Sequence, residues 1–322
     1  MSNNVSIEYA NGIIKTLEKN LLTREKIVRL QDADDVDSAV RILLECNYGS
    51  GSFDGDIDAL LFEEENKVTN TFKELMPSGY ALETFVYIND YHNAKACYKS
   101  KIVGKTNPSA LRPTGLFDVV GAFETENHRF LPTYMQEAIA YLDELDRKGQ
   151  ITASEIDNAF DKAYYKNVFS DLEKAKKSVA YDYYVLQVDS LNIKNFVRCK
   201  KIGLNFSEYS KAFIDGGKTD LNRLKTIYPL SEEECGEKMK FGEYSEDFAV
   251  LVRDYSAYET FADNRLIRLF KKEKSDMFSP SPVLGYYLGK LCELKVVRTV
   301  LTCKANNLDR NEIRKRIRET YA

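Results

Sequence analysis

Two Gly-Lys-Thr triplets, at residues 104–106 and 217–219, have the composition that ends a phosphate-binding loop. Such a loop needs another glycine five residues earlier, so that successive backbone N–H groups can surround the phosphates. Lys99 and Ala212 stand at those two positions. The residues before each triplet also favour a helix, whose C-terminal carbonyls repel phosphate. We therefore interpret Gly104 and Gly217 as glycines that end helices, and we predict no nucleotide site.

Four carboxylates match the spacing of a calcium-binding loop, in which alternate side chains converge on one cation. They stand at loop positions 1, 3, 5 and 12, as Asp54, Asp56, Asp58 and Glu65. The sixth position requires glycine for a sharp turn but holds Ala59. Acidic side chains also stabilise the N-terminus of a helix without any metal. The pattern therefore favours the start of a helix over a calcium site.

Histidine and cysteine could provide metal ligands or a nucleophile, but their spacing supports neither. The chain has two histidines, His92 and His128, and Cys97 is the one thiol near the first of them. The six cysteines lie far apart, as reduced thiols do in a cytosolic protein. A Cys–His pair formed by residues distant in sequence stays open. From these patterns we predict no catalytic residues, no cofactor and no metal.

The composition excludes several other classes of protein. The 46 basic and 50 acidic side chains give a net charge of −4, whereas a nucleic-acid-binding protein would show a basic excess. No run of about 18 apolar residues exists, so no helix is expected to span a membrane. The N-terminal residues lack the basic and apolar segments of a secretory signal. We therefore expect a cytoplasmic protein.

Proline placement and periodicity favour helices throughout. Residues 1–76 and 133–228 contain no proline, which permits long helices there. In residues 282–305, leucines and other apolar side chains recur every three or four positions along one helix face. Residues 84–87 and 248–252 are the best strand candidates, but both are short enough to be parts of helices. The sequence predicts an all-α protein.

Helix ends can be located from capping residues. Thr152, Ser231 and Asp309 are each followed three residues later by glutamate, the spacing of a capping box. Ser281 is expected to cap the helix over 282–305, and Asp34 the helix over 35–46. The segment 133–148 ends in basic residues and a glycine, as helices commonly do.

A short polar pattern recurs about every one hundred residues. It reads Asp90, Asn93 and Lys95 in the first copy and Asp189, Asn192 and Lys194 in the second. The third copy has diverged, with the residues Lys290, Glu293, Lys295 and Arg298. Such recurrence predicts repeated structural units. We place them at residues 1–108, 109–207 and 208–322, with the terminal helices free to pair across units.

A second pair of similar segments supports the repeat. The segment 22–30 resembles 221–227, about two repeat lengths later, and no copy is visible between them. Each copy is followed by an acidic cap and by a helix that ends near a tyrosine, Tyr48 or Tyr244. The lysines near these patterns share helix faces with other cations, and such faces are either solvated or directed at a partner.

The two ends of the chain resemble a known family. The resemblance rests on Tyr9, Asn11 and Leu17–Thr23 at the N-terminal end, and on residues 285–301 and 308–318 at the C-terminal end. In these segments the chain resembles the C subunit of bacterial and archaeal V/A-type ATPases, a relative of the eukaryotic d subunit. The middle third is similar in helical character and repeat spacing rather than in identities.

The resemblance implies a funnel-shaped, all-helical protein of three similar domains in a pseudo-threefold arrangement. It further implies a non-catalytic rotor subunit on the cytoplasmic face of the membrane. There it would join the central shaft of the soluble ATPase sector to the proteolipid ring and transmit torque for H⁺ or Na⁺ translocation. From the repeats, we expect the inner wall that receives the shaft to include Asn93, Lys95, Asn192, Lys194, Glu293, Lys295 and Arg298. The alternative is a helical adaptor unrelated to ion pumping, although solenoid repeats are usually shorter.

Overall fold

The computed structural model describes residues 5–49, 53, 55–175, 178–240 and 243–322, and none of these residues lies in a strand. The predicted all-α class is confirmed. The chain divides into two compact units. The first joins residues 1–80 to 253–322, and the second contains residues 81–252. No helix in the described part of the chain is long and apolar enough to cross a membrane.

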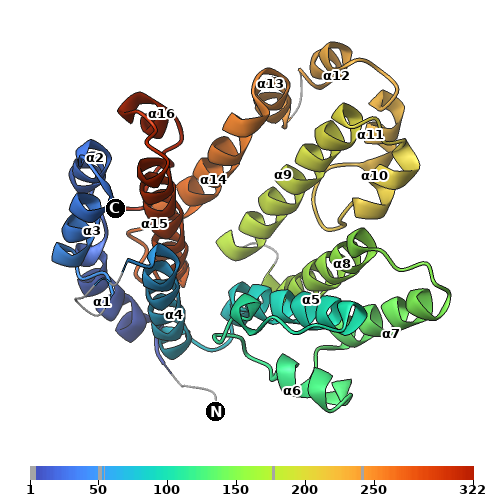
Figure 1. The fold of residues 1–322 in the computed structure, drawn as a ribbon, viewed down its shortest axis with the longest axis horizontal. Coiled ribbons are helices and arrows are strands. Elements are labelled where there is room, and N and C mark those ends of the chain that lie inside the picture. Colours follow the sequence, from blue (N-terminus) through green and yellow to red (C-terminus); the bar gives the residue numbers. More distant parts are fainter. Residues whose placement is uncertain (1–4, 50–52, 54, 176–177, 241–242) are drawn as a thin grey trace. The chain divides into compact units, whose positions relative to one another are not determined.

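The first unit is built around α15, whose 25 residues lie against α1, α4 and α14 (Figure 1). Nearly every turn of α15 is buried, which explains why apolar residues occupy more than one of its faces. The helices of this unit are α1 (Ile7–Leu17), α2 (Arg24–Asp32), α3 (Val36–Glu45), α4 (Ile57–Leu75), α14 (Tyr255–Lys272), α15 (Ser281–Ala305) and α16 (Arg310–Lys315), with the short 3₁₀ helix η1 (Glu18–Asn20).

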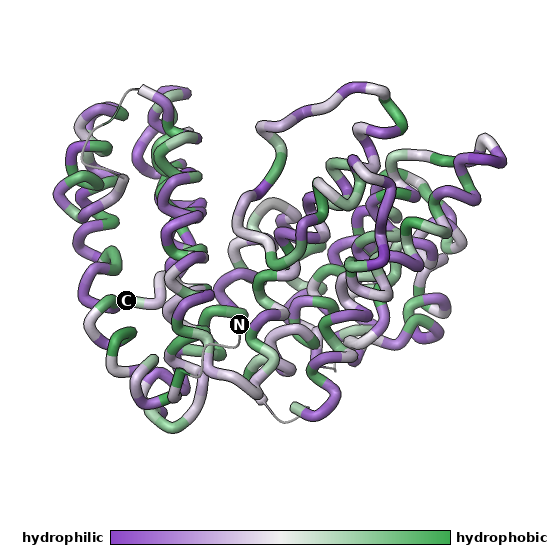
Figure 2. Tube along the Cα trace, turned by 90° about the horizontal axis from the view of Figure 1, so that it is seen from below, coloured by the Kyte–Doolittle hydropathy of each residue, from purple (hydrophilic) through white to green (hydrophobic). Residues whose placement is uncertain are grey.

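The core of the first unit combines both ends of the chain. Leu30 and Leu43 from the N-terminal helices pack in one apolar cluster with Val300 and Leu301 of α15 and with Ile313 of α16. Along the helices, hydrophobic and hydrophilic residues both occur within single turns, as they do in helices with one buried face (Figure 2). The N-terminal segment is therefore fixed by burial against the C-terminal helices.

The second unit contains two groups of helices, one around α8 and one around α9. The helix α8 packs against α5 and α7, and α9 packs against α10 (Figure 1). The helices are α5 (Tyr87–Val103), α6 (Val119–Glu124), α7 (Thr133–Arg147), α8 (Ala153–Asp171), α9 (Val179–Lys201), α10 (Phe206–Ala212), α11 (Leu221–Ile227), α12 (Glu232–Met239) and α13 (Ser245–Arg253), with η2 (Leu82–Phe85), η3 (Pro108–Ala110), η4 (His128–Phe130) and η5 (Leu172–Ala175).

Aromatic rings fill the core of the second unit. The ring of Tyr91 on α5 meets that of Tyr164 on α8 edge to face, with centroids 5.6 Å apart. On α9, Phe196 meets Tyr209 and Phe248 in similar geometry, at 5.6 and 5.9 Å. Edge-to-face pairs of this kind stabilise a core beyond the area that they bury. The absence of tryptophan in the sequence is thus offset by tyrosine and phenylalanine.

Most of the predicted helix ends are confirmed. The side chains of Thr152, Ser231 and Asp309 accept hydrogen bonds from backbone N–H groups in the first turns of α8, α12 and α16. Ser231 and Glu234 form a complete capping box. Gly149, at φ +65°, follows the end of α7. The strand candidates lie in η2 and the start of α5, and in α13.

Two capping predictions are wrong. Pro280 rather than Ser281 is the N-cap of α15, and the hydroxyl of Ser281 donates to the Glu273 carboxylate at 2.5 Å. The cap of α3 is Asp35, whose carboxylate accepts from the N–H of Ser38 at 2.8 Å. Its neighbour Asp34 instead pairs with an arginine of α16. Each observed cap therefore lies one residue away from the predicted one.

Candidate functional site

The recurring asparagine joins each long helix to the loop that follows it. On α5, Nδ2 of Asn93 donates to the carbonyl of Arg112, and its Oδ1 accepts from the N–H of the same residue, both at 2.8 Å. On α9, Asn192 makes the same two bonds with Ile214, at 2.8 and 2.9 Å. One amide thus satisfies both backbone groups of one loop residue, as a neighbouring strand would. The polar pattern that recurs at residues 90–95 and 189–194 therefore corresponds to a repeated structure.

The recurring aspartate, one turn earlier, holds the same loop farther along. Oδ1 of Asp90 accepts from two successive backbone N–H groups, those of Leu116 and Phe117. The carboxylate of Asp189 accepts in the same way from Lys218 and Thr219. Each aspartate and asparagine pair therefore fixes its loop at two points.

Glycine allows the close approach of loop and helix. A Cβ placed on Gly115 or Gly217 would lie 2.2 Å from a carboxylate oxygen of Asp90 or Asp189. The interpretation of Gly217 as the end of a helix is therefore wrong, because this glycine serves packing against α9. Gly104 does end α5, in the left-handed conformation with φ +68°.

In the third copy a carboxylate replaces the asparagine and makes several bonds. The buried Glu293 accepts from the backbone N–H of Leu22 at 2.5 Å and from the hydroxyl of Tyr48. The Lys290 ammonium donates to the same carboxylate at 2.5 Å and lies 3.6 Å from Glu64. Burial, followed by the charge of Glu293, raises the pKa of Tyr48 well above its usual value. This network fastens the N-terminal segment to α15.

The second pair of similar segments now has a physical basis. Tyr48 and Tyr244, which end its two copies, each donate to a buried carboxylate of a long helix, Glu293 and Asp189 respectively. Both units thus contain a tyrosine–carboxylate bond, although the carboxylates stand at different positions of the repeat, Glu293 at that of the asparagine and Asp189 at that of the aspartate.

One lysine near the end of α9 and one near the end of α15 satisfy the last carbonyls of shorter helices. Nζ of Lys200 donates to the carbonyls of Tyr228 and Leu230, both at 2.6 Å, at the end of α11. Lys304 donates in the same way to Gln31 and Ala33 at the end of α2. Helix C-termini carry unpaired carbonyls and a partial negative charge, which a cation satisfies. Desolvation lowers the pKa of Lys304.

The predicted site residues divide into two groups. Asn93, Asn192 and Glu293 are buried, and their polar atoms bond to their own chain. The four cations lie at or near the surface on α5, α9 and α15. Lys95 pairs with Asp161 at 2.6 Å, Lys295 pairs with Asp263 at 3.0 Å, Arg298 pairs with Asp58, and Lys194 is half-buried on α9.

An open groove along α5 contains the first of these cations. It has a volume of about 850 Å³, and Lys95 and Lys99 project from α5 toward Asp161 and Asp157 of α8. Both ion pairs are 2.6 Å long. Nε2 of His92, also in this groove, lies 2.8 Å from the carbonyl of Ala110. Lys95 and Lys99 are therefore paired within the chain itself.

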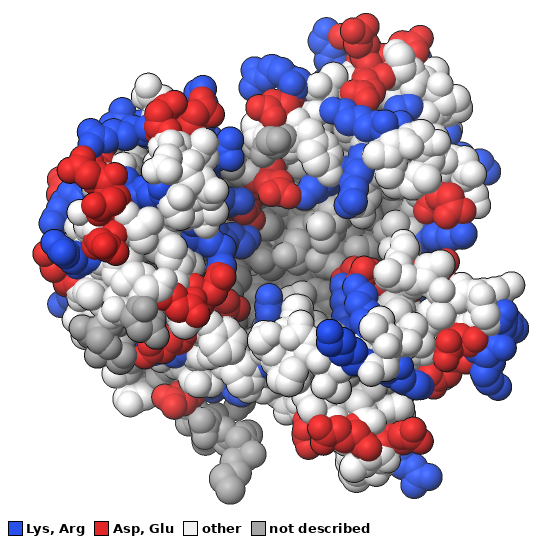
Figure 3. Space-filling view, in the orientation of Figure 1, with Lys and Arg blue, Asp and Glu red and all other residues white. Residues whose placement is uncertain are grey.

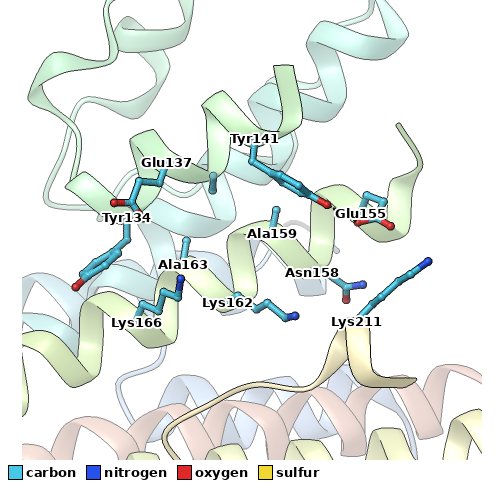
Figure 4. A pocket seen from close by; sticks show the side chains of 11 residues that line it. Tyr134, Glu137, Tyr141, Glu155, Asn158, Ala159, Lys162, Ala163, Lys166 and Lys211 are labelled. Atoms are coloured by element: carbon cyan, nitrogen blue, oxygen red, sulfur yellow. Dashed lines mark hydrogen bonds between the residues drawn. The ribbon is translucent and has the colours of Figure 1, made fainter. Parts of the chain in front are cut away.

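A second groove, of about 390 Å³, lies between α7 and α8 with Lys211 of α10 at one end (Figure 4). Small side chains such as Ala159 and Ala163 form its floor, and Lys162 and Lys166 extend from α8. Desolvation lowers the pKa of Lys162. The hydroxyl of Tyr141 donates to a carboxylate at the rim.

The surface carries both signs of charge. On the face shown in Figure 3, Lys and Arg alternate with Asp and Glu over each unit. Mixed charge favours oriented, specific contacts with proteins over general attraction to a polyanion. Of the candidate calcium loop, Asp54 lies outside the described residues. Asp56 caps α4 by accepting from the N–H of Ala59, as expected of a helix start.

The cysteines carry no bond to each other and are largely buried. Burial raises the pKa of Cys292 to about 11 and also raises the pKa of Cys97, Cys199 and Cys235. A thiol must ionise to act as a nucleophile. These four are therefore poorly suited to that role.

Fold and site together define an all-helical protein whose repeated polar residues bind its own backbone. The chain belongs to the family described as ATP synthase (C/AC39) subunit, which matches residues 10–316. It is 22% identical to the A-type ATP synthase C subunit of Methanococcoides burtonii, over 96% of this chain and 93% of that protein. It is 20% identical to the V-type sodium ATPase C subunit of Enterococcus hirae, over 97% and 98%. The A-type ATP synthase C subunit of Pyrococcus furiosus is 22% identical, over 97% and 90%.

Proposed function

We propose that the chain is a non-catalytic rotor subunit of a V/A-type ATPase. In this role it forms the socket between the central shaft of the soluble ATPase sector and the membrane proteolipid ring. It transmits torque between the two and so couples ATP turnover to H⁺ or Na⁺ translocation. It lies at the cytoplasmic face and is attached to the membrane through the complex.

The match of the family over nearly the whole chain carries this proposal. The repeated bonds between long helices and loops support it physically. A coupling piece must resist shear, and helices that pack along their length and fix their loops at several points give stiffness. Three repeated units around one axis, the arrangement expected from the family resemblance, would suit such a socket.

Among the predicted site residues, we assign contact with the shaft to the four cations. Lys295 and Arg298 can reorient toward acidic groups of a partner, because both cations are more than half exposed in their pairs with Asp263 and Asp58. Lys95 and Lys194 are only partly exposed, so we place them at the edge of this contact. Exposed ion pairs contribute little to folding and are readily exchanged. The buried Asn93, Asn192 and Glu293 then act indirectly, by setting the positions of the helices that carry the cations.

Affinity purification of the tagged chain from its native cell tests the proposal. Recovery of the proteolipid ring, shaft and catalytic subunits together is the expected result, and ATP hydrolysis should be absent from the purified chain alone. A preparation that lacks all three would overturn the rotor role and favour the helical adaptor. Extraction with mild detergent keeps the membrane sector attached during this test.

A further inference from the structure

The residues that follow α16 form an irregular strap, which we define as residues 317–322 and which ends beside α15 (Figure 1). The strap adopts neither helix nor strand. Nevertheless, Ile317 packs against the core cluster of the first unit, and Tyr321 is only 2% exposed. The strap must therefore be held by contacts with the helices that it crosses.

The ring of Tyr321 fills a notch on α15 that two glycines leave open. A Cβ on Gly285 would lie 2.5 Å from the hydroxyl oxygen of Tyr321, and a Cβ on Gly289 would lie 2.4 Å from the Cβ of the same tyrosine. Residues four apart share one face of a helix, so the two glycines together form the notch. The ammonium of Lys274 lies over the ring, 4.5 Å from its centroid, and donates to the carbonyl of Tyr321 at 3.2 Å. Tyr321 is therefore the residue that fastens the strap to α15.

Polar groups of the strap hold more than one turn of α14. Nε of Arg318 donates to the Asp263 carboxylate at 2.6 Å, and neither side chain is more than 20% exposed. The backbone N–H of Glu319 donates to Oδ1 of Asn264 at 2.7 Å. The Glu319 carboxylate also accepts from Nε of Arg268 at 3.0 Å. The strap therefore bonds to α14 while its tyrosine lies on α15, and it joins the two helices.

The helix α14 has little apolar burial of its own to hold it. Among its described residues, only the side chains of Tyr258, Ile267 and Phe270 are buried, whereas most residues of α15 are buried. An ion pair between Lys295 and Asp263 also joins α14 to α15, but Lys295 is more than half exposed, and such pairs contribute little. Segments with few buried apolar contacts open at the lowest free energy. The attachment of α14 therefore depends on the strap.

One thiol of α15 lies beneath the strap and can report whether the strap is closed. Sγ of the buried Cys292 donates to the carbonyl of Glu319 at 3.4 Å. Cys303, about three turns along the same helix, is also buried, but it packs in the core cluster of the first unit. Opening of the strap would expose the first thiol, whereas only unfolding of the core would expose the second.

We propose that the strap is a clasp, which opens and closes over α14 and α15 while the core of the first unit stays folded. Tyr321 locks the clasp by filling the notch of Gly285 and Gly289, and α14 is the helix that its opening releases. The clasp goes beyond the proposed function, because it needs no partner protein and operates in the isolated chain.

Alkylation of thiols in the whole chain tests the clasp, with mass spectrometry measuring the rate at each cysteine. With iodoacetamide at constant pH, the rate at Cys292 should change little in low urea, whereas the rate at Cys303 should rise steeply, because urea dependence scales with the surface that opening exposes. Tyr321→Ala should raise the rate at Cys292 by at least about tenfold and leave that at Cys303 unchanged, since no ring then fills the notch. Tyr321→Phe keeps the ring and should react like wild type. Equal urea dependence of the two thiols would overturn the proposal, because the strap would then open only when the unit unfolds.

A milder variant provides the test if the alanine variant does not fold. Glu319→Gln removes the charge that pairs with Arg268 and should raise the rate at Cys292 about threefold. Glu312→Gln is the matched control, because Glu312 pairs with Lys315 on α16 and lies outside the strap. Amide hydrogens of α14, but not those of α4, should exchange faster in the Glu319 variant. Equal rates at Cys292 in this variant, its control and wild type would show that the polar contacts of the strap do not hold it closed, and would overturn the clasp.

Discussion

The buried carboxylate of Glu293 accepts a hydrogen bond from the backbone N–H of Leu22 at 2.5 Å, across 271 positions of sequence. This bond joins the N-terminal segment to the last long helix, and Tyr48 and Lys290 complete the network around the same carboxylate. Glu293 thus occupies, in the third copy of the repeat, the place that asparagine holds in the other two.

Glu293→Gln should destabilise the first unit by about 3–5 kcal/mol, the range for breaking a buried ion pair by removing one partner. The neutral amide leaves the buried Lys290 with Glu64 alone, at 3.6 Å. The measurement is urea unfolding followed by circular dichroism. Glu45→Gln is the control, because Glu45 pairs with Arg29 at the surface and should shift stability by less than about 1 kcal/mol. Similar shifts for the two variants would contradict the role of the network.

Asn192→Asp should cost about 1–3 kcal/mol, because a carboxylate cannot donate to the carbonyl of Ile214 and leaves it unpaired. The loop that contains Ile214 should then exchange its amide hydrogens faster. Hydrogen exchange with mass spectrometry measures this directly. Asn195→Asp, on the same helix but partly exposed, should leave the exchange unchanged. Unaltered protection of Ile214 in the Asn192 variant would argue against the two-way bond.

The sequence alone predicted the helices and the positions that recur, but not what the recurring residues bind. Proline-free stretches and capping residues located α7, α8, α12 and α16 because these signals are local. Asn93 and Asn192 were marked by their spacing, yet that spacing does not identify their partners Arg112 and Ile214, each of which stands three residues before the packing glycine, Gly115 or Gly217. Sequence spacing does not reveal burial, and an asparagine within a helix can either face solvent or bond to backbone groups. The inward direction of these residues therefore required the structure.

Glycine substitutions should have opposite effects at two positions of the second unit. Gly217→Ala places a Cβ 2.2 Å from Oδ1 of Asp189 and should destabilise the protein by about 1–3 kcal/mol, as overpacking does. Gly236→Ala, in α12, meets no atom within 4 Å and should stabilise it by about 0.5–1 kcal/mol. Thermal unfolding of both variants provides the comparison. A gain in stability for the Gly217 variant would mean that the loop does not need its close approach to α9.

Reversing the charge of Lys295 should affect association with the shaft more than the stability of the fold. Lys295→Glu replaces a surface pair with Asp263 by a like-charge contact, so its effect on stability should be about 1 kcal/mol or less. If Lys295 meets acidic groups of the shaft, association should slow and its salt dependence should weaken. Surface plasmon resonance with purified shaft proteins at several salt concentrations measures both. Lys315→Glu, on the exposed α16, is the control. Identical association rates for the two variants would remove Lys295 from the shaft interface.

Lys162 provides a test of pH dependence with a definite sign. Desolvation lowers its pKa in the folded chain below the ordinary value of 10.5, although nearby Asp215 and Glu155 oppose the shift. The unfolded chain therefore binds the proton more tightly, so the protonated amine destabilises the fold at neutral pH. This cost is constant below the folded pKa and declines as the pH rises from that value toward 10.5. Lys162→Met should raise the urea midpoint at pH 7, and its advantage over wild type should shrink near pH 10. Lys166→Met, one turn along α8 and exposed, should change stability by less than about 0.5 kcal/mol at either pH. An advantage that grows between pH 7 and pH 10 would show that Lys162 is stabilised rather than penalised in its groove.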